Sequence, residues 1–476
     1  MIYLIGNPQV KAVMDTRRAL ESKGLSTKIL VPNRHWVRPA EDAGIFEIPF
    51  GDIYSLFYYL VKPENERIKN YTIDDFVAPE GYKPEGEVKP LKYIATDSKY
   101  LIINTFKYTE IISNITYFEN DEWVRKEEYN DVGRLINVQF PQGPDSEKIQ
   151  VVSHDGSIAF EFETEGKYRS PKNINSIAEN LSFENEASFY AYVIRKISEG
   201  KAINDKIFVM DHQVSHALVN ELFFNRSFSK NGLYLLVTEN IQAILNEERK
   251  RHTIPRYESV IFNTLEEMQM FLPHFEEKAK PRFYFNNFTT IDTIPKIKTE
   301  NKSLFFTIGT TDAEEFMTNL NKFLETHTNT KIYLYTVNPE QNKIITESIP
   351  EKFKEQIEVL FNTPIQIVEE KVAQSEAYIF CHEGLAVQIS EEWERAIGAH
   401  LPVFTLPTLE GLDVYINRDS GRVVSKENLF NVLEQFLSMS DYRSYADDPK
   451  GFQEQFSVEK TGERWLEILN DKSIQL

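Results

Sequence analysis

Two glutamates and an arginine within Ser375–Leu406 are the residues whose types and spacing best suit chemistry on a substrate. Seven residues separate Glu383 from Glu391, and Arg395 follows about one helical turn later. The apolar pattern around them predicts strand, loop, helix and strand. In an α/β enzyme the loop and the helix N-terminus of such a unit lie at the carboxyl ends of the strands, where a sugar nucleotide can bind. The stretch is therefore the first candidate for a donor site.

Other residue patterns that could carry chemistry are less complete. His212 and His216 have the i, i+4 spacing of a metal-binding pair, but the stretch reads H-Q-V-S-H and lacks the glutamate of H-E-x-x-H. Cys381 is the only cysteine, which excludes an internal disulfide, and we expect it to be buried at a strand end. No Walker A, Rossmann or G-x-S-x-G fingerprint occurs. These patterns predict no metal, no cofactor and no nucleophile.

Length and composition limit the class of protein. The chain has 476 residues, 13% of them aromatic, which is enough for two large folded domains. Its net charge of −20 argues against a general nucleic-acid binder, because such a protein needs a basic face. No apolar run of about 18 residues occurs and the first residues do not resemble a signal peptide. We expect a cytoplasmic protein, with peripheral contact at the inner face of the membrane left open.

The order of predicted elements indicates an α/β protein with two Rossmann-like, doubly wound domains and an antiparallel β-sheet inserted in the first. Six strand-like runs lie between Tyr100 and Glu163, separated by turn sequences such as END, NDVG and HDG. In the second domain we predict a helix at Pro350–Leu360 and a strand at Ile365–Ile367. The predicted boundaries are 1–90 and 169–290 for the N-terminal domain, 91–168 for the insertion, 291–457 for the C-terminal domain and 458–476 for a final helix.

Three short stretches resemble a known family. They are the final helix with W-L-x-x-L-N at 465–470, the insertion segment YFENDEWVRKEEYNDVGRLI with HDGSIAFEF after it, and R-A-I-G-A-H-L-P-V at 395–403. The last is similar to the E-A-x-x-x-x-x-P-V anchor of the donor-site helix in retaining GT-B glycosyltransferases. With the layout of the chain, these stretches resemble the proteins that O-glycosylate serine-rich-repeat adhesins before export by the accessory Sec system, and most closely the GtfB-like glycosyltransferase-stabilising proteins.

The resemblance implies a test for catalysis at the start of the second domain. The active enzymes of the family neutralise the departing nucleotide diphosphate with an Arg and a Lys, which supply charge and hydrogen-bond donors. The corresponding segment here reads IGTTDAEEF at 308–316, and nothing between Lys302 and Lys322 is basic. We expect an acidic first helical turn capped by Thr311. The diphosphate clamp is therefore predicted to be missing, and no catalytic residue is assigned.

The two glutamates of the opening stretch also fall out of register with the family. If Pro402-Val403 is aligned on the family's Pro-Val, the family's glutamate pair falls on Val387 and Arg395, so Glu383 and Glu391 lie four residues early. At 100° per residue, Glu391 also points away from the apolar stripe of its helix. We interpret Glu383, Glu391 and Arg395 as remnants of a donor site.

The preferred hypothesis is a non-catalytic subunit that binds an acceptor and stabilises a catalytic partner. The resemblance implies a GtfA-like GT-B glycosyltransferase as that partner, a Ser/Thr-rich acceptor protein, and N-acetylglucosamine as the sugar. Tyr117, Trp123 and Tyr129 of the insertion are candidate acceptor-binding residues, unless they only pack the sheet as cross-strand neighbours. The alternatives are an active retaining GT-B glycosyltransferase with an altered donor site, and a GT-B-like component of accessory Sec export.

Overall fold

The structure is a computed structural model of the whole chain. Its description covers residues 1–32, 48–61, 71–86, 90–107, 109–130, 133–153, 155–166, 169–177, 179–198, 205–210, 216–224, 232–237, 244, 246–263, 265–274, 281–286, 288, 290–309, 312–381, 390–406, 416, 418–438 and 445–470. The chain folds into two compact units. One comprises Met1–Phe288 with Trp465–Leu476, and the other Thr289–Arg464.

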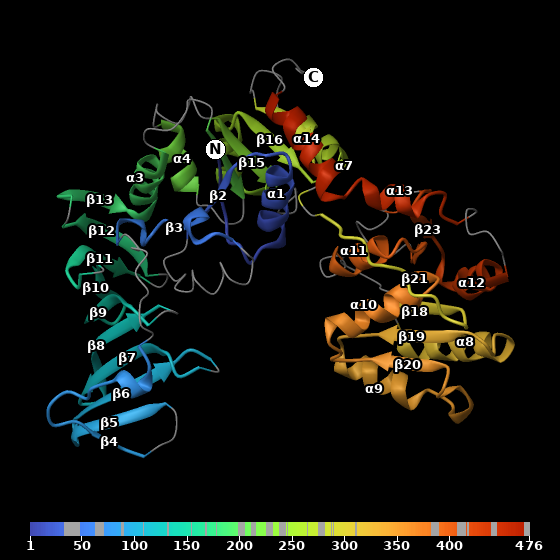
Figure 1. Ribbon diagram of the computed structural model, residues 1–476, viewed down its shortest axis with the longest axis horizontal. Helices are drawn as coiled ribbons and strands as arrows, with labels where there is room; N and C mark the ends of the chain where they lie inside the picture. Colours follow the sequence, from blue (N-terminus) through green and yellow to red (C-terminus); the bar gives the residue numbers. More distant parts are fainter. Residues whose placement is uncertain are drawn as a thin grey trace. The chain divides into compact units, whose positions relative to one another are not determined.

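The first unit is built on a parallel sheet of seven strands in the order β17-β16-β15-β14-β1-β2-β3 (Figure 1). The central strands are buried on both faces, as expected for a parallel sheet covered by helices. Counted without the insertion, the strand order is 3-2-1-4-5-6 with one further strand, the Rossmann arrangement. The strands are β1 (Ile2–Ile5), β2 (Thr27–Val31), β3 (Ile53–Ser55), β14 (Lys206–Met210), β15 (Leu233–Val237), β16 (Ser259–Phe262) and β17 (Arg282–Phe285).

Helices cover both faces of this sheet. One face packs against α1 (Lys11–Ser22) and the end of α14 (Val458–Asn470), where the fully buried Trp465 lies beside Phe208 and Phe288. The other face packs against residues from α3 (Glu186–Ser198), α4 (His216–Phe224) and α7 (Leu265–Phe271), with α6 (Glu248–Thr253) beside α4. The tryptophan of the W-L-x-x-L-N stretch thus anchors the end of the chain in the core of the first unit.

The insertion is an antiparallel sheet of ten strands in sequence order, from β4 to β13. It extends from Lys83 to Asn185, beyond the predicted 91–168 at both ends. Polar strands such as KNINS carry little apolar alternation, so the sequence pattern did not reveal them. The strands are β4 (Lys83–Pro84), β5 (Leu91–Thr96), β6 (Lys99–Thr105), β7 (Ile112–Glu119), β8 (Glu122–Tyr129), β9 (Leu135–Gly143), β10 (Ser146–Val152), β11 (Ile158–Glu165), β12 (Ser170–Ser176) and β13 (Leu181–Asn185).

The two faces of the insertion differ along its length. At the β10–β12 end one face is apolar and packs against Phe57 and helix α3, which joins it to the core of the first unit. Farther along, at β6–β9, the same face becomes polar, while the opposite face carries an apolar cluster with Leu101, Ile103 and Ile115. Tyr71, Ile73 and Phe76, from the segment before β4, pack against that cluster. The sheet therefore has its own small core and does not need its polar face for folding.

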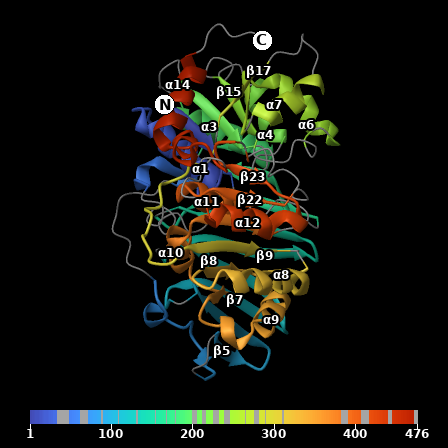
Figure 2. The same cartoon turned by 90° about the vertical axis from the view of Figure 1, so that its right-hand side faces the viewer.

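The second unit is a parallel sheet of six strands in the order β20-β19-β18-β21-β22-β23, which is again 3-2-1-4-5-6. Figure 1 labels β18 to β21, and Figure 2 labels β22 and β23. Its strands are β18 (Ser303–Ile308), β19 (Lys331–Tyr335), β20 (Ile357–Leu360), β21 (Ala377–Cys381), β22 (Val403–Thr405) and β23 (Gly421–Val423). One face packs against α8 (Ala313–Thr326), α9 (Pro339–Glu347) and α12 (Leu429–Ser438). The other packs against α10 (Ile365–Gln374), α11 (Ser390–Gly398) and α13 (Pro449–Glu454). Both units therefore confirm the predicted α/β class.

Two predicted elements of the second unit are wrong. The predicted helix Pro350–Leu360 is a short 3₁₀ turn followed by strand β20, and the predicted strand Ile365–Ile367 is the first turn of α10. The real helix before β20 is α9, which starts at Pro339 behind an Asn338 cap. A proline at the first helical position and an Asn before it are the usual start signals, so the sequence did contain this information. Of the helices that the structure describes, none combines the length and apolarity required to cross a membrane.

Candidate functional site

The first candidate site lies at the carboxyl ends of β18 and β21, where the strand order of the second sheet reverses. Here the backbone N–H of Gly309 donates to the carbonyl of Cys381 at 3.2 Å. In open α/β sheets ligands bind at such a reversal, with anions on the N-terminus of the helix that follows the first strand. In this chain that helix is α8.

A carboxylate occupies the N-terminus of α8. Asp312 is the N-cap, and its Oδ1 accepts hydrogen bonds from the backbone N–H groups of Glu314 and Glu315, each at 3.1 Å. The predicted cap, Thr311, is outside the described residues, and Asp312 performs the capping. Asp312, Glu314 and Glu315 together give this helix end an acidic character that opposes a second anion. The N–H groups that would bind a phosphate therefore bind the protein's own carboxylate.

A lysine that the sequence pattern did not reveal also lies beside this helix. Lys426, from the short 3₁₀ helix after β23, forms an ion pair with Glu315, with 2.7 Å between Nζ and Oε2. A basic side chain thus reaches the first turn of α8 from more than one hundred residues along the chain. Because Glu315 neutralises it there, the local charge remains negative with Asp312 and Glu314 included.

The candidate residues on the donor-site helix are only partly within the described chain. Glu383 lies outside the described residues, and Glu391 is in the first turn of α11 although its side chain is not described. Arg395 is in the last turn of α11 and is half-buried. The structure therefore does not bring the two glutamates together as a described pair.

The buried acid of α11 is the neighbouring residue, Glu392, which is 9% exposed. It and Arg395 act on Tyr378 of β21, whose hydroxyl shares a 2.7 Å hydrogen bond with Thr307 of β18. Burial raises the pKa of Tyr378 and the charge of Glu392 raises it further, whereas the Thr307 hydrogen bond and Arg395 oppose the rise. The helix stripe of Trp393, Ala396 and Ile397 is buried as predicted, but the sequence pattern gave no sign that an acid would share it. This cluster lies under the helix and supports its packing on the sheet.

The second candidate site is on the inserted sheet, and its aromatic residues lie on opposite faces. Tyr117 and Tyr129 belong to the face with the apolar cluster, where Tyr129 stacks on Tyr71 with ring centroids 5.2 Å apart. Glu127 accepts hydrogen bonds from the Tyr129 hydroxyl at 3.0 Å and from Arg125 at 2.5 Å, and the Arg125 guanidinium lies 5.6 Å from the Tyr117 ring. These two tyrosines pack this end of the sheet.

Burial is also the main cause of their altered acidity. It raises the pKa of Tyr117 to about 12, with a further rise from Glu127 and an opposing effect of Arg125. Burial raises the pKa of Tyr129 as well, and the charge and hydrogen bond of Glu127 add to the increase. Both hydroxyls are therefore neutral throughout the physiological pH range, where they serve as hydrogen-bonding groups only.

Trp123 lies on the other face because of a β-bulge. In the β7–β8 ladder Tyr117 pairs with Arg125, but Phe118 pairs with Trp123, so Val124 is the extra residue. Strict alternation along β8 would place Trp123 on the same face as Tyr129. The bulge inserts one residue and turns the indole to the polar face, a common use of bulges next to sites. Next to it, Phe118 stacks on Tyr100 with centroids 4.7 Å apart.

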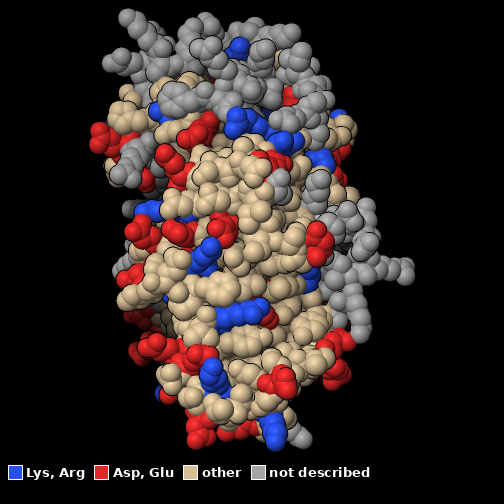
Figure 3. Space-filling view, turned by 90° about the vertical axis from the view of Figure 1, so that its left-hand side faces the viewer, with Lys and Arg blue, Asp and Glu red and all other residues tan. Residues whose placement is uncertain are grey.

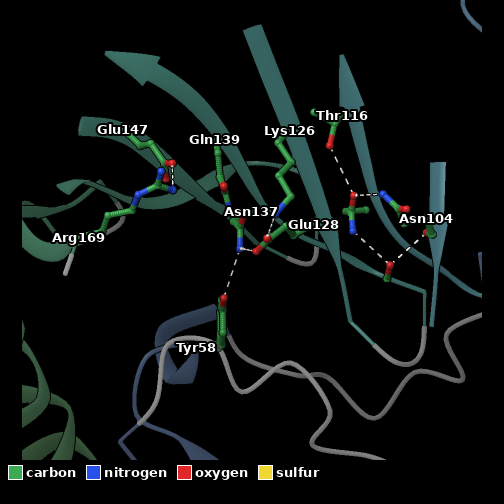
Figure 4. Close-up of polar contacts among 11 residues, drawn as sticks. Tyr58, Asn104, Thr116, Lys126, Glu128, Asn137, Gln139, Glu147 and Arg169 are labelled. Atoms are coloured by element: carbon green, nitrogen blue, oxygen red, sulfur yellow. Dashed lines mark hydrogen bonds and ion pairs between the residues drawn. The ribbon is translucent and has the colours of Figure 1, made fainter. Parts of the chain in front are cut away.

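Beside these aromatic rings, the polar face carries two groups of hydrogen-bonded side chains, one on β6 and β7 and the other on β8 and β9 (Figure 4). Asn104 donates to Asn114 at 2.9 Å, while Gln139 donates to Asn137 at 3.1 Å. Asn137 donates in turn to Glu128 at 3.1 Å and to the Tyr58 hydroxyl at 3.3 Å. We call this set the polar lattice; its members are Asn104, Asn114, Thr116, Lys126, Glu128, Asn137 and Gln139.

Glu128 is the charged centre of the polar lattice. Burial alone would raise its pKa, but the charge and hydrogen bond of Lys126 and the amides of Asn137 and Gln139 outweigh this effect. The pKa of Glu128 is therefore below the ordinary value. The carboxylate is ionised at neutral pH and holds Lys126 at 2.5 Å, which fixes the side chains on either side of it.

A shallow pocket of about 260 Å³ lies where the lattice meets the aromatic rings. Two of its walls are aromatic, and the others present an amide, a hydroxyl, two cations and one carboxylate. The carboxylate, Glu147 of β10, is 5% exposed and pairs with Arg169 at the end of the β11–β12 hairpin (Figure 4). The lining residues, hereafter the pocket, are Thr116, Phe118, Trp123, Lys126, Gln139, Glu147 and Arg169.

The molecular face shown in Figure 3 carries acidic and basic residues in small groups around a largely uncharged centre. On this face the described Lys and Arg side chains are interspersed with Asp and Glu and do not gather into a broad basic patch. This distribution agrees with the net charge of −20 and gives no support for nucleic-acid binding. Among the described residues, no group of three or more His, Cys, Asp or Glu could hold a metal ion.

Comparison with known proteins adds the fold. No family model matches the sequence, and no curated protein matches it. Solved structures do match: a chain of the GtfA/B complex has a TM-score of 0.74 at 14% identity, covering 98% of this chain and 99% of that one. This chain has the GT-B fold. At such identity the likeness concerns the fold and not the chemistry.

Two further GT-B-like structures match over the same extent. The pneumococcal O-GlcNAc transferase GtfA, solved with UDP and GlcNAc, has a TM-score of 0.68 at 12% identity, with 98% of each chain covered. A chain from the structure of accessory secretory proteins 1, 2 and 3 of Streptococcus pneumoniae has a TM-score of 0.70 at 11% identity, again with 98% of each covered. Folds similar to that of this chain therefore occur in an O-GlcNAc transferase and among accessory secretory proteins, so the fold alone does not select between these roles.

Proposed function

We propose that this chain is a non-catalytic subunit of a protein O-glycosyltransferase complex, in which it binds the Ser/Thr-rich acceptor and stabilises a GtfA-like catalytic partner. The observation that carries the proposal is the state of the α8 N-terminus. Asp312 accepts from the N–H groups that a diphosphate would need, and Glu314 and Glu315 add negative charge beside it. A transferase must stabilise the charge that develops on the leaving diphosphate, and an acidic helix end does the opposite.

The acceptor would bind the polar face of the inserted sheet. Its amides, hydroxyls and the half-exposed Trp123 are groups that suit an extended polypeptide with small polar side chains. Tyr117 and Tyr129, on the other face, are assigned to packing of the sheet. The transferred sugar, N-acetylglucosamine, would come from the donor bound to the partner.

Release of UDP is the direct test. The purified chain is incubated with UDP-N-acetylglucosamine and an unmodified Ser/Thr-rich repeat polypeptide, alone and with a GtfA-like partner. We expect no UDP release by the chain alone, and faster release and a higher unfolding temperature for the partner when both are present. Turnover of the donor by the isolated chain would contradict the proposal.

The second candidate function is an active glycosyltransferase with an altered donor site, which the position of Lys426 beside α8 favours. In that case Lys426 and Arg395 would take the place of the family's clamp, and Glu383 or Glu391 would hold the donor sugar. Replacing Lys426 and Arg395 by Gln in a reconstituted complex should then abolish transfer. A role in accessory Sec export instead predicts co-purification with secretion components and no effect on sugar transfer.

A further inference from the structure

The backbone of Arg169 is unusual among the described residues. Its φ is +44°, in the left-handed region, whereas the other described non-glycine residues with positive φ are all Asn, Asp or His. Those three types adopt this conformation most readily, while an arginine there is uncommon and strained. Strain of this kind persists where the surroundings hold it, and it is frequent at binding sites.

The strained conformation directs the side chain into the pocket. Arg169 belongs to the β11–β12 hairpin, and its guanidinium donates to Oε1 of Glu147 on β10, the strand next to the one that carries Gln139. Glu147 is 5% exposed, whereas about half of the Arg169 side chain is exposed. The carboxylate is therefore the fixed member of the pair, and the remaining guanidinium N–H groups are available at the pocket rim.

The charges in the pocket cancel in pairs. Lys126 is paired with Glu128, which lies just outside the lining, and Arg169 is paired with Glu147, so the lining and Glu128 together carry no net charge. A ligand of this pocket would thus be uncharged, with carbonyl or hydroxyl oxygens for the guanidinium and apolar groups for Trp123. The volume of about 260 Å³ is below the range of typical small-molecule sites, which suits a short stretch of a longer chain.

We propose that Arg169, held by Glu147, is a specificity-determining residue of the acceptor site, and that it recognises backbone carbonyl oxygens of an extended, uncharged polypeptide rich in small hydroxyl side chains. Trp123 provides the apolar wall against which that segment lies. This inference rests on the proposed function, because it assigns a pocket to the acceptor. Glu147 acts through Arg169 and is a positioning residue.

The test is isothermal titration calorimetry of the full chain with a synthetic 20-residue peptide of Ser, Thr and Ala without sugars. Arg169→Asn removes the guanidinium but keeps a residue that tolerates positive φ, so we expect the peptide Kd to rise by about tenfold or more with no fall in unfolding temperature. Glu147→Gln should weaken binding as well. The double variant should bind no more weakly than Arg169→Asn alone, because both residues act as one unit.

Lys172→Gln is the matched control. Lys172 is on the same hairpin and pairs with Glu165, but it does not line the pocket, so its loss should change the Kd less than about twofold. If the wild-type chain binds the peptide and Arg169→Asn binds it equally well, the role of Arg169 is refuted while acceptor binding stands. If the wild-type chain does not bind the peptide, the proposed function fails instead. Arg169-dependent binding of free N-acetylglucosamine without peptide binding would overturn the assignment to a polypeptide.

Discussion

Substitution of Asp312 separates its two roles at the N-terminus of α8, as a helix cap and as a negative charge. Asp312→Ala removes both hydrogen bonds to Glu314 and Glu315 together with the charge. Loss of a cap costs about 1 kcal/mol, and loss of a favourable charge at a helix N-terminus about 0.5 kcal/mol. The expected loss in unfolding free energy is therefore about 1.5 kcal/mol. Asp312→Ser keeps a capping oxygen, so it should lose only about 0.5 kcal/mol.

The same variants test the absence of a donor site. Near a protein surface two like unit charges 4 Å apart repel by about 4 kcal/mol, so the Asp312 carboxylate alone would strongly disfavour a diphosphate at this helix end. Removing it still leaves Glu314 and Glu315 and supplies no cation. We therefore expect neither variant to bind UDP at millimolar concentration.

Two measurements check these values. Urea unfolding is monitored by hydrogen exchange of peptides from α8. Because these peptides belong to the second unit, their exchange reports its stability separately from that of the first. Titration calorimetry with UDP reports the donor site. Submillimolar UDP binding by Asp312→Ser would refute the reasoning, because it would mean that a functional phosphate site lies beneath a removable cap. Equal destabilisation by Ala and Ser would show that the cap contributes little.

Three further predictions concern the packing and the polar lattice. Trp465→Ala should destabilise the first unit by about 3–5 kcal/mol, because the fully buried indole lies beside Phe208 and Phe288. Trp465→Phe should cost far less, since the buried Nε1 of Trp465 has no hydrogen-bond partner among the described atoms. Hydrogen exchange of peptides from β1 and β14 should therefore become much faster in Trp465→Ala than in Trp465→Phe. Gly421→Ala should disrupt the β22–β23 pairing, because an added Cβ would lie 2.0 Å from the Val403 carbonyl oxygen. Hydrogen exchange of the β23 amides should then become faster. The control Gly51→Ala, which has open space around its Cβ, should leave this exchange unchanged. Glu128→Gln should cost about 1–2 kcal/mol at pH 7. The folded-state pKa of Glu128 is lowered, so its contribution to the unfolding free energy is fully present above the usual glutamate pKa of about 4.3 and is lost as the pH falls through the folded-state pKa. The unfolding free energies of wild type and variant, measured in urea, should therefore converge in acid. A difference that persists undiminished at pH 2 would contradict this assignment.

The α/β architecture could be predicted because its signals are local. Continuous apolar runs such as IYLI and SLFFTI predict central strands, and both are buried throughout. In the insertion, turn sequences such as END and HDG between short apolar runs predict the middle strands. The errors also have local causes. At Ile365 the spacing of apolar residues fits either a short strand or the start of a helix. Only the length of the whole element, the ten residues of α10, distinguishes the helix from the strand.

The candidate site was less predictable because it depends on geometry between distant residues. The bulge at Val124 places Trp123 on the opposite face of the sheet from the one that strict alternation predicts, and nothing in the sequence E-W-V-R-K indicates the extra residue. Lys426 reaches Glu315, and Arg169 reaches Glu147, only after the sheets have formed. The acidic segment at 312–315 was visible in the sequence, but that Asp312 caps the helix with both hydrogen bonds was not.

The contrast between the two candidate sites supports a binding role. At the strand reversal of the second sheet the polar groups satisfy one another, as when Asp312 caps α8 and Glu315 pairs with Lys426. The polar lattice of the insertion is arranged differently. Its amides and the Glu128 carboxylate, whose pKa is lowered, are ordered on one face of the sheet, while the apolar cluster that supports folding lies on the other face. Ordering polar side chains on a half-buried face adds only about 1 kcal/mol of stability per hydrogen bond, since each one replaces a hydrogen bond to water. We therefore infer that the lattice is arranged for a ligand, and that the function of this chain depends on the inserted sheet.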